Sequence, residues 1–132
     1  FLAWREVGLN PYGNSVIVNA EFLAKNKPVI DKFVKVTQRA FAACVKDPKP
    51  CVQALIDANG ALSFDNELVN WQLVEVLMSD RTSREVALGI HDDARMKADY
   101  ELVRNYVGID KPFEVKSVYT NEFLDRSIRM SK

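Results

Sequence analysis

The stretch Ser15-Val16-Ile17-Val18-Asn19 decides the fold class that we expect. Its three consecutive β-branched residues show no alternation with polar ones, a pattern typical of a strand buried on both faces. A second, shorter strand is considered over residues 2–7. Because a Val-Ile-Val strand needs hydrogen-bonding neighbours on both sides, we expect its partners to lie outside this chain. The predicted class is therefore α/β, with the chain itself mainly helical.

The sequence on either side of this stretch supports the same view. Phe1-Leu2-Ala3-Trp4 is apolar from its first residue, whereas the ends of domains are usually polar and exposed. We therefore expect the chain to be the C-terminal portion of a longer protein. On the other side, apolar residues at helical spacing predict helices over residues 20–26, 28–46, 50–59, 63–79 and 92–107, and a last helix from Thr120 with Phe123, Leu124 and Ile128 facing inward.

Local signals mark several of these helix ends. Pro28 suits a first helical position, Asp47-Pro48 closes that helix, and Asn59-Gly60 closes the next one. Asp92 is a candidate N-cap, and Gly108 is a candidate terminator. The residues from Thr82 to Glu85 have capping-box spacing. The longest helix should bury a single stripe of side chains: Ile30, Phe33, Val34, Thr37, Ala40, Phe41 and Cys44.

Composition excludes several classes of function. The chain has 132 residues, 48% of them apolar and 27% charged, which fits one globular domain. Lys plus Arg equals Asp plus Glu at 18 each, so no excess charge is available to hold a nucleic acid or an anionic membrane. No apolar run approaches the roughly 20 residues that span a bilayer. We expect a protein with no nucleic-acid partner.

Few residues offer catalytic or metal-binding chemistry. His91 is the single histidine, and without a second His or suitably spaced Cys it does not predict a metal site. We expect it in the loop before the Asp92 cap. No nucleophile or phosphate-binding motif occurs, so we predict no catalytic residue, no metal and no cofactor. A mixed-charge set resembles an anion clamp but is more typical of solvated helix ends: Asp80, Arg81, Arg84, Asp92, Asp93 and Arg95.

Two further features leave alternatives open. Cys44 and Cys51 flank a helix corner, and the residues alone suit either two buried thiols or a disulfide, depending on the compartment. Tyr12-Gly13-Asn14 joins a loop to the expected strand. A plain turn accounts for it, but an aromatic ring, an open backbone and an amide also suit contact with a neutral or zwitterionic small molecule.

The order of features along the chain resembles the C-terminal part of bacterial ABC-transporter substrate-binding proteins. The subgroup is the one that binds thiamine pyrimidine precursors, nitrate, taurine and alkanesulfonates. The residues that carry the resemblance are Gly8 with Tyr12-Gly13-Asn14, Val16-Ile17-Val18, Phe22-Leu23, Asn26-Lys27-Pro28, Asp47-Pro48 and Tyr119-Thr120-Asn121-Glu122-Phe123-Leu124. It spans nearly the whole chain but only about the last third of a typical member.

This resemblance implies a two-lobed periplasmic-binding-protein type II fold that traps a small-molecule solute between its lobes and delivers it to an ABC permease in the membrane. Residues 1–19 would cross between the lobes, ending in a strand, and residues 20–132 would form the helical part of the first lobe. The intact protein would be a periplasmic monomer, whereas this chain alone, with an unpaired strand edge, is expected to associate. An exported protein also implies a disulfide between Cys44 and Cys51.

The resemblance further implies that Tyr12, Gly13 and Asn14 contact the solute, with Trp4 a candidate by proximity alone. In pyrimidine-precursor binders a Tyr and an acidic residue meet the ligand near this crossing. Tyr12 matches the first, but Asn14 replaces the acid, which argues against a cationic aminopyrimidine. Two rival classes remain: a pyrimidine-synthesising enzyme whose catalytic residues lie outside this chain, and an independent helical interaction module.

Overall fold

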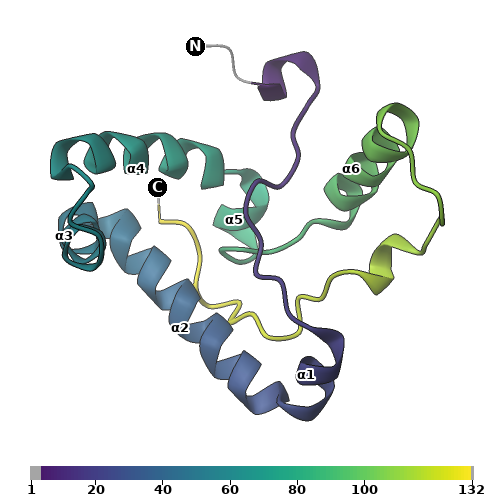
Figure 1. Cartoon of the computed structure of the whole chain (residues 1–132), viewed down its shortest axis with the longest axis horizontal. Coiled ribbons are helices and arrows are strands. Elements are labelled where there is room, and N and C mark those ends of the chain that lie inside the picture. Colours follow the sequence, from purple (N-terminus) through teal and green to yellow (C-terminus); the bar gives the residue numbers. More distant parts are fainter. Residues whose placement is uncertain (1–3, 132) are drawn as a thin grey trace. The chain divides into compact units, whose positions relative to one another are not determined.

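The computed structural model describes residues 4–131, which divide into two compact units. Of these residues, 4–26 and 91–122 form unit 1, and 27–90 and 123–131 form unit 2. Each unit therefore combines two stretches that are far apart in the sequence. The helices of both are labelled in Figure 1.

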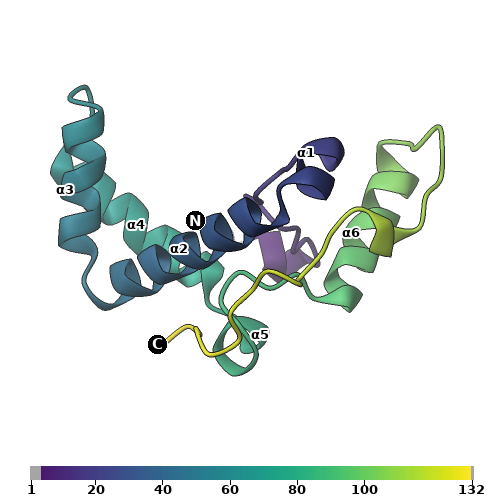
Figure 2. The same cartoon turned by 90° about the horizontal axis from the view of Figure 1, so that it is seen from below.

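Unit 2 is built on helices α2 to α5. Their bounds are Lys27–Lys46 for α2, Pro48–Ala58 for α3, Phe64–Met78 for α4 and Arg81–Glu85 for α5. Helix α3 packs against both α2 and α4 (Figure 2). The predicted helices over 28–46, 50–59 and 63–79 are thus confirmed to within about two residues. The capping box of α5 begins at Asp80 rather than Thr82, because the Asp80 carboxylate accepts from Ser83 N at 2.6 Å.

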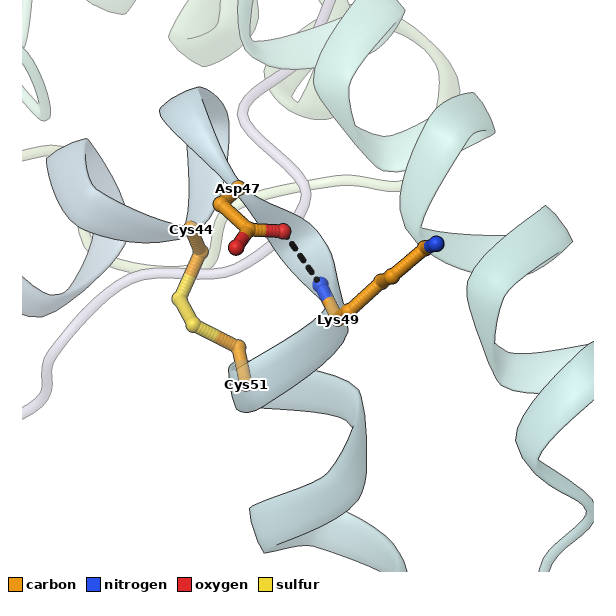
Figure 3. The surroundings of a disulfide bond; sticks show 4 residues. All are labelled: Cys44, Asp47, Lys49 and Cys51. Carbon is orange, nitrogen blue, oxygen red and sulfur yellow. Dashed lines mark hydrogen bonds between the residues drawn. A yellow bond between two sulfur atoms is a disulfide. The ribbon is translucent and has the colours of Figure 1, made fainter.

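A disulfide closes the corner between α2 and α3. Asp47 caps α3 by accepting a hydrogen bond from Lys49 N at 3.2 Å, and Pro48 occupies the first position of the helix. This turn brings the Cα atoms of Cys44 and Cys51 to 5.8 Å, and the two residues are bonded to each other (Figure 3). The pair that the resemblance implies to be bonded therefore lies at disulfide distance.

The core of unit 2 centres on Val45, Leu88 and Met130, and these buried residues come from three distant parts of the chain. Half-buried side chains complete the cluster: Ala42, Trp71, Met78 and Ile128. The stripe expected along α2 is confirmed only in part. Ile30 and Cys44 are buried, but the Phe33 side chain is 54% exposed.

The predicted helix from Thr120 is wrong, because residues 120–131 form turns and irregular backbone. Tertiary hydrogen bonds hold this segment instead. Asp125 N donates to Gln38 Oε1 at 2.8 Å, and Met130 N donates to Ser83 O at 3.0 Å. Gln38 is itself buried and donates to Leu88 O at 2.9 Å. Amide groups bound to distant partners cannot also form a local helical ladder.

Unit 1 contains a 3-10 turn η1 (Trp4–Val7), helices α1 (Ala20–Lys25) and α6 (Asp93–Tyr106), and a second 3-10 turn η2 (Val115–Ser117). Asn19 caps α1 by accepting from Phe22 N, and Asp92 caps α6 by accepting from Arg95 N at 2.9 Å. Gly108 follows α6 with a φ of 97°, a left-handed conformation that favours glycine. The predicted ends of the helix over 92–107 are confirmed.

The predicted strand at Val16-Ile17-Val18 is wrong in this structure, and residues 4–131 contain no β-strand. The side chains of Val16 and Ile17 are 52% and 93% exposed. A strand exists only through backbone pairing, and no neighbouring strand is present in the described chain to supply it. The strand considered over residues 2–7 is η1 from Trp4 onward, and its first residues lie outside the described range.

Candidate functional site

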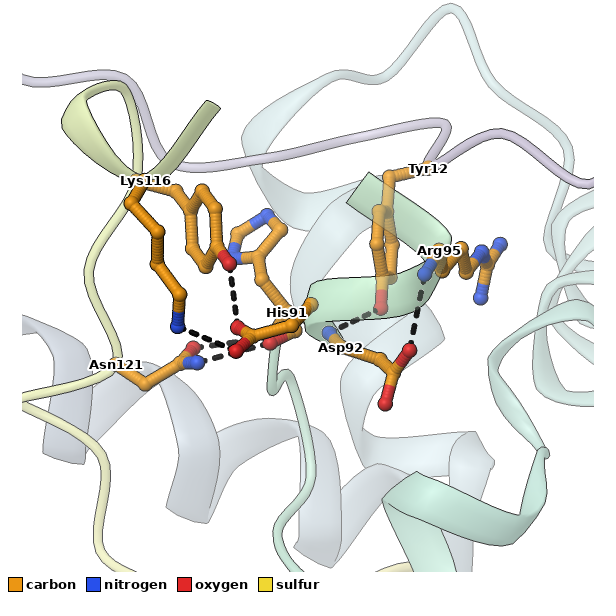
Figure 4. Close-up of polar contacts among 8 residues, drawn as sticks. Tyr12, His91, Asp92, Arg95, Lys116 and Asn121 are labelled. Carbon is orange, nitrogen blue, oxygen red and sulfur yellow. Dashed lines mark hydrogen bonds and ion pairs between the residues drawn. The ribbon is translucent and has the colours of Figure 1, made fainter. Parts of the chain in front are cut away.

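Tyr12 stands at the centre of a polar and aromatic cluster in unit 1 (Figure 4). Its hydroxyl accepts a hydrogen bond from Asp92 N at 2.7 Å, and its backbone N–H donates to Asp99 Oδ2 at 3.2 Å. The Arg95 guanidinium carbon lies 3.9 Å from the centroid of the phenol ring, which is cation–π geometry. The loop that carries Tyr12 is therefore attached to the first turns of α6.

His91 lies beside Tyr12. The ring centroids are 4.9 Å apart in an edge-on arrangement, and His91 Nε2 lies 3.1 Å from Ser15 Oγ. Asn121 binds the His91 backbone at both ends, accepting from its N–H at 3.0 Å and donating to its carbonyl at 2.8 Å. Partial burial, and next the positive charge of Arg95, lower the pKa of His91. The neutral form of the imidazole therefore predominates at pH 7.

A charged group lies on the other side of His91. The carboxylate of Asp93 binds the Lys116 ammonium and accepts a hydrogen bond from the Tyr119 hydroxyl. The hydrogen bond from Lys116 lowers the pKa of Asp93, and the same bond raises the pKa of Lys116. The Tyr119 ring completes the arrangement, with its centroid 5.7 Å from that of His91.

The predicted site residues have different surroundings. Tyr12 is half-buried, with one ring face and its hydroxyl occupied by protein groups. Gly13 is exposed, and an added Cβ would meet open space, so no steric contact demands glycine there. Asn14 is exposed. Trp4 lies in η1 and its side chain is 67% exposed. The structure thus leaves Gly13, Asn14 and Trp4 accessible.

Several residues of the cluster were not predicted from the sequence as site residues. Ser15 and Asn121 were named only within longer motifs, and Asp99 was not named at all. His91 was expected only to precede a cap, which it does. One available signal was the spacing of Asp92, Arg95 and Asp99, which places them on one helical face. In the mixed-charge stretch, Asp80 and Asp92 cap helices, and Arg81 pairs with Glu85 at 2.8 Å, roles typical of solvated helix ends.

The cluster offers neutral and paired polar groups rather than excess charge. Asn14 and Ser15 are exposed and supply donors and acceptors, and the Ser15 hydroxyl lies beside the His91 imidazole. Within residues 4–131 there is no group of three or more His, Cys, Asp or Glu arranged to hold a metal ion. This chemistry suits hydrogen bonding to a small solute.

A hollow of unit 1, between α6 and η2, has a different character from the Tyr12 cluster. It has a volume of about 260 Å³, and its exposed lining is apolar. Its walls are formed by Met96, Asp99, Tyr100, Val103, Ile109, Phe113, Val115 and Val118. Without exposed polar groups, this hollow offers nothing to orient an anionic or hydrogen-bonding solute.

Comparison with known protein families gives a match to the N-terminal part of the chain. The family described as NMT1/THI5 like matches residues 1–51. The matched range contains the Tyr12 segment, α1 and α2, and it ends at Cys51. No significant match was found among curated proteins or among solved structures. None of the helices between residues 4 and 131 is long and apolar enough to cross a membrane.

Proposed function

We propose that this chain is part of the solute-binding component of an ABC importer, which traps a small organic or anionic solute between two lobes and delivers it to a membrane permease. The observation that carries the proposal is the NMT1/THI5-like match, because residues 1–51 include the whole segment with Trp4, Tyr12, Gly13 and Asn14. This family consists mostly of substrate-binding proteins. We therefore propose binding and no catalysis.

The local geometry supports a solute contact at Gly13 and Asn14. Both residues are exposed, while the preceding Tyr12 is held by hydrogen bonds from two directions. A contact residue on a fixed support loses little conformational entropy when it binds. The neutral amide of Asn14 presents both a donor and an acceptor, which suits an anionic or uncharged solute better than a cation. The exposed indole of Trp4 is a further candidate contact.

The disulfide supports an exported protein. Bonds of this kind persist in oxidising compartments such as the bacterial periplasm and are rare in the cytosol. Cys44 and Cys51 are joined in the structure. In this proposal the protein works in the periplasm, residues 1–19 cross between its lobes, and residues 20–132 belong to the first lobe.

Calorimetric titration tests the proposal directly. Nitrate, taurine, an alkanesulfonate and an aminopyrimidine precursor of thiamine are titrated separately into the intact protein that contains this chain. We expect saturable binding of one of the first three solutes. Asn14→Ala should weaken that binding by about tenfold, the value of one hydrogen bond to a charged group. Its melting temperature should stay the same, because Asn14 is exposed.

Asn105→Ala is the matched control, because Asn105 is another exposed amide of unit 1, near the end of α6. It should leave the affinity unchanged. Absence of binding for every solute would refute the proposed function. A lowered melting temperature with unchanged affinity in Asn14→Ala would make Asn14 a turn residue.

A further inference from the structure

We propose that Arg95 is a positioning residue, which together with Asp92 and Asp99 locks the Asn10–Tyr12 segment onto α6 and thereby fixes where Gly13 and Asn14 are presented. We call the contacts of Asp92, Arg95 and Asp99 with residues 10–12 the lock. Its effect on solute binding rests on the proposed function, whereas the contacts themselves lie within unit 1 and do not depend on it.

Helical geometry places the three residues of the lock together. Residues 92, 95 and 99 are separated by three and four positions, so their side chains and the adjacent backbone lie along one face at the start of α6. The side chains of Arg95 and Asp99 are half-buried on this face. Asp92 contributes twice, since its carboxylate caps the helix and its own N–H remains available to the phenol of Tyr12.

The side chains of the lock form hydrogen bonds with successive backbone groups of the Asn10–Tyr12 segment. Arg95 Nε donates to Asn10 O at 2.6 Å, and Nη2 donates to Pro11 O at 2.9 Å. The next backbone group, Tyr12 N–H, donates to Asp99 Oδ2. A segment with no helix or sheet of its own needs such partners for its polar backbone groups, and α6 supplies them in sequence.

Arginine is suited to this task by its shape. Its planar guanidinium directs two N–H groups at two neighbouring carbonyls and still presents a flat face to the Tyr12 ring. A lysine at the same position keeps the charge but has a single compact ammonium. We therefore expect lysine to preserve part of the lock and an apolar residue to abolish it.

The lock changes the role that Tyr12 plays. One ring face lies against Arg95 and the hydroxyl is bonded to Asp92 N, so Tyr12 acts mainly as the anchor of the segment. The groups left to meet a solute are then Gly13 and Asn14, immediately after the anchor. Asn14 owes its position to side chains more than 80 residues away in the sequence, as the contact between Asn10 and Arg95 shows, with a separation of 85.

Hydrogen exchange followed by NMR tests the lock without any solute. In Arg95→Met, we expect protection of the Tyr12 amide to fall by at least about tenfold, because two hydrogen bonds from a charged donor are lost. Arg95→Lys should give an intermediate loss. The nuclear Overhauser contacts between side chain 95 and the Tyr12 ring should weaken in the same order, a signature that general destabilisation of α6 would not produce.

Arg104→Met is the matched control. Arg104 lies on the same helix, is half exposed and pairs with Glu101 at 2.6 Å, away from the lock. It should leave Tyr12 protection unchanged. Unchanged protection of Tyr12 in Arg95→Met would overturn the proposal, as would a loss of equal size along all of α6 in both variants.

The same variants separate the lock from the proposed function. A solute that binds the wild type should bind Arg95→Met more weakly, in step with the loss of Tyr12 protection. If the wild type binds no solute but Arg95→Met loses Tyr12 protection, the lock stands and the proposed function fails. If solute affinity and Tyr12 protection are both unchanged in Arg95→Met, the lock fails and the proposed function stands.

Discussion

Different interactions stabilise each of the two units of this chain: apolar burial in unit 2, and polar and ring contacts in unit 1. Every buried residue of the described chain belongs to unit 2: Ile30, Gln38, Cys44, Val45, Val52, Ser83, Ala87, Leu88 and Met130. The described part of unit 1 has none, and its long-range contacts are hydrogen bonds, ring contacts and ion pairs around Tyr12 and His91. Apolar burial resists salt and pH, whereas exposed polar contacts respond to both. Unit 1, which carries the candidate site, should therefore be the less stable unit and the one more sensitive to salt and pH.

The largest effect should come from the core of unit 2. Leu88→Ala removes a side chain that is 4% exposed and packs with Val45 and Met130, so it should lower the free energy of unfolding by about 2 to 5 kcal/mol. Leu77→Ala is the control, since Leu77 is 61% exposed on α4. Urea denaturation followed by circular dichroism measures both. Equal losses in the two variants would remove the distinction between core and surface.

The disulfide should contribute the next largest amount. Replacing both Cys44 and Cys51 with Ser opens a loop of sequence separation 7, which costs about 2 to 3 kcal/mol at most in the chain-entropy treatment. Hydrogen exchange should show the loss in α2 and α3 and leave the amides of unit 1 unchanged. Thiol titration of the unfolded, unreduced protein should find no reactive thiol. Two reactive thiols would contradict the assignment.

Acid should weaken unit 1 before unit 2. The pKa of His91 is lowered from 6.5 in the folded chain, so the unfolded chain takes up the proton first as the pH falls. The stabilisation from neutral His91 is therefore complete above about pH 6.5 and is lost as the pH falls toward the folded-state pKa. NMR titration should show Tyr12 and Ser15 signals shifting in this window while the signals of α3 stay constant.

His91→Gln is the control for this acid response, because glutamine keeps a polar group and does not titrate. The NMR signals of unit 1 in this variant should not shift between pH 7 and the folded-state pKa of the wild-type histidine. Pairing with Lys116 lowers the pKa of Asp93 below its ordinary value of 3.8. A second loss of stability in unit 1 is therefore expected only as the pH falls below 3.8. An unchanged response in His91→Gln would assign the first transition to another group.

The smallest change in stability should come from the exposed pair Val16 and Ile17. Ile17→Thr alters a side chain that is 93% exposed, so the free energy of unfolding should change by no more than about 0.5 kcal/mol. Association of the isolated chain should decrease, because exposed apolar residues favour contact between copies. Light scattering after size-exclusion chromatography measures the mass. A wild-type chain that is strictly monomeric would contradict this expectation.

Helices were predictable where short-range signals define them. Asp47-Pro48 separates α2 from α3, Asp92 caps α6 and Gly108 follows it, as expected. These signals work because a cap or a proline acts on backbone groups only two to four residues away. The Val16–Val18 prediction failed for the opposite reason: β-propensity forms no strand without a pairing partner.

The candidate site was only half predictable. Tyr12, Gly13 and Asn14 stood out by residue type, and the NMT1/THI5-like match covers them. Nothing in the local sequence paired Tyr12 with Arg95, because these residues lie about 80 positions apart and meet only when α6 returns to the loop. The burial of Gln38 was not predictable from the local sequence either. Gln38 is polar and lies outside the expected apolar stripe of its helix, yet it is only 5% exposed and donates a hydrogen bond to Leu88 O.

The sequence by itself determined most of the helices, the positions of most caps and the closeness of Cys44 and Cys51 across a short corner, because each depends on neighbours within one or two helical turns. Only the tertiary structure decided that residues 123–131 would be irregular, that Val45, Leu88 and Met130 would share a core, and that α6 would hold the Tyr12 loop. Those outcomes depend on backbone and side-chain groups that meet across long sequence separations, where propensity carries no information.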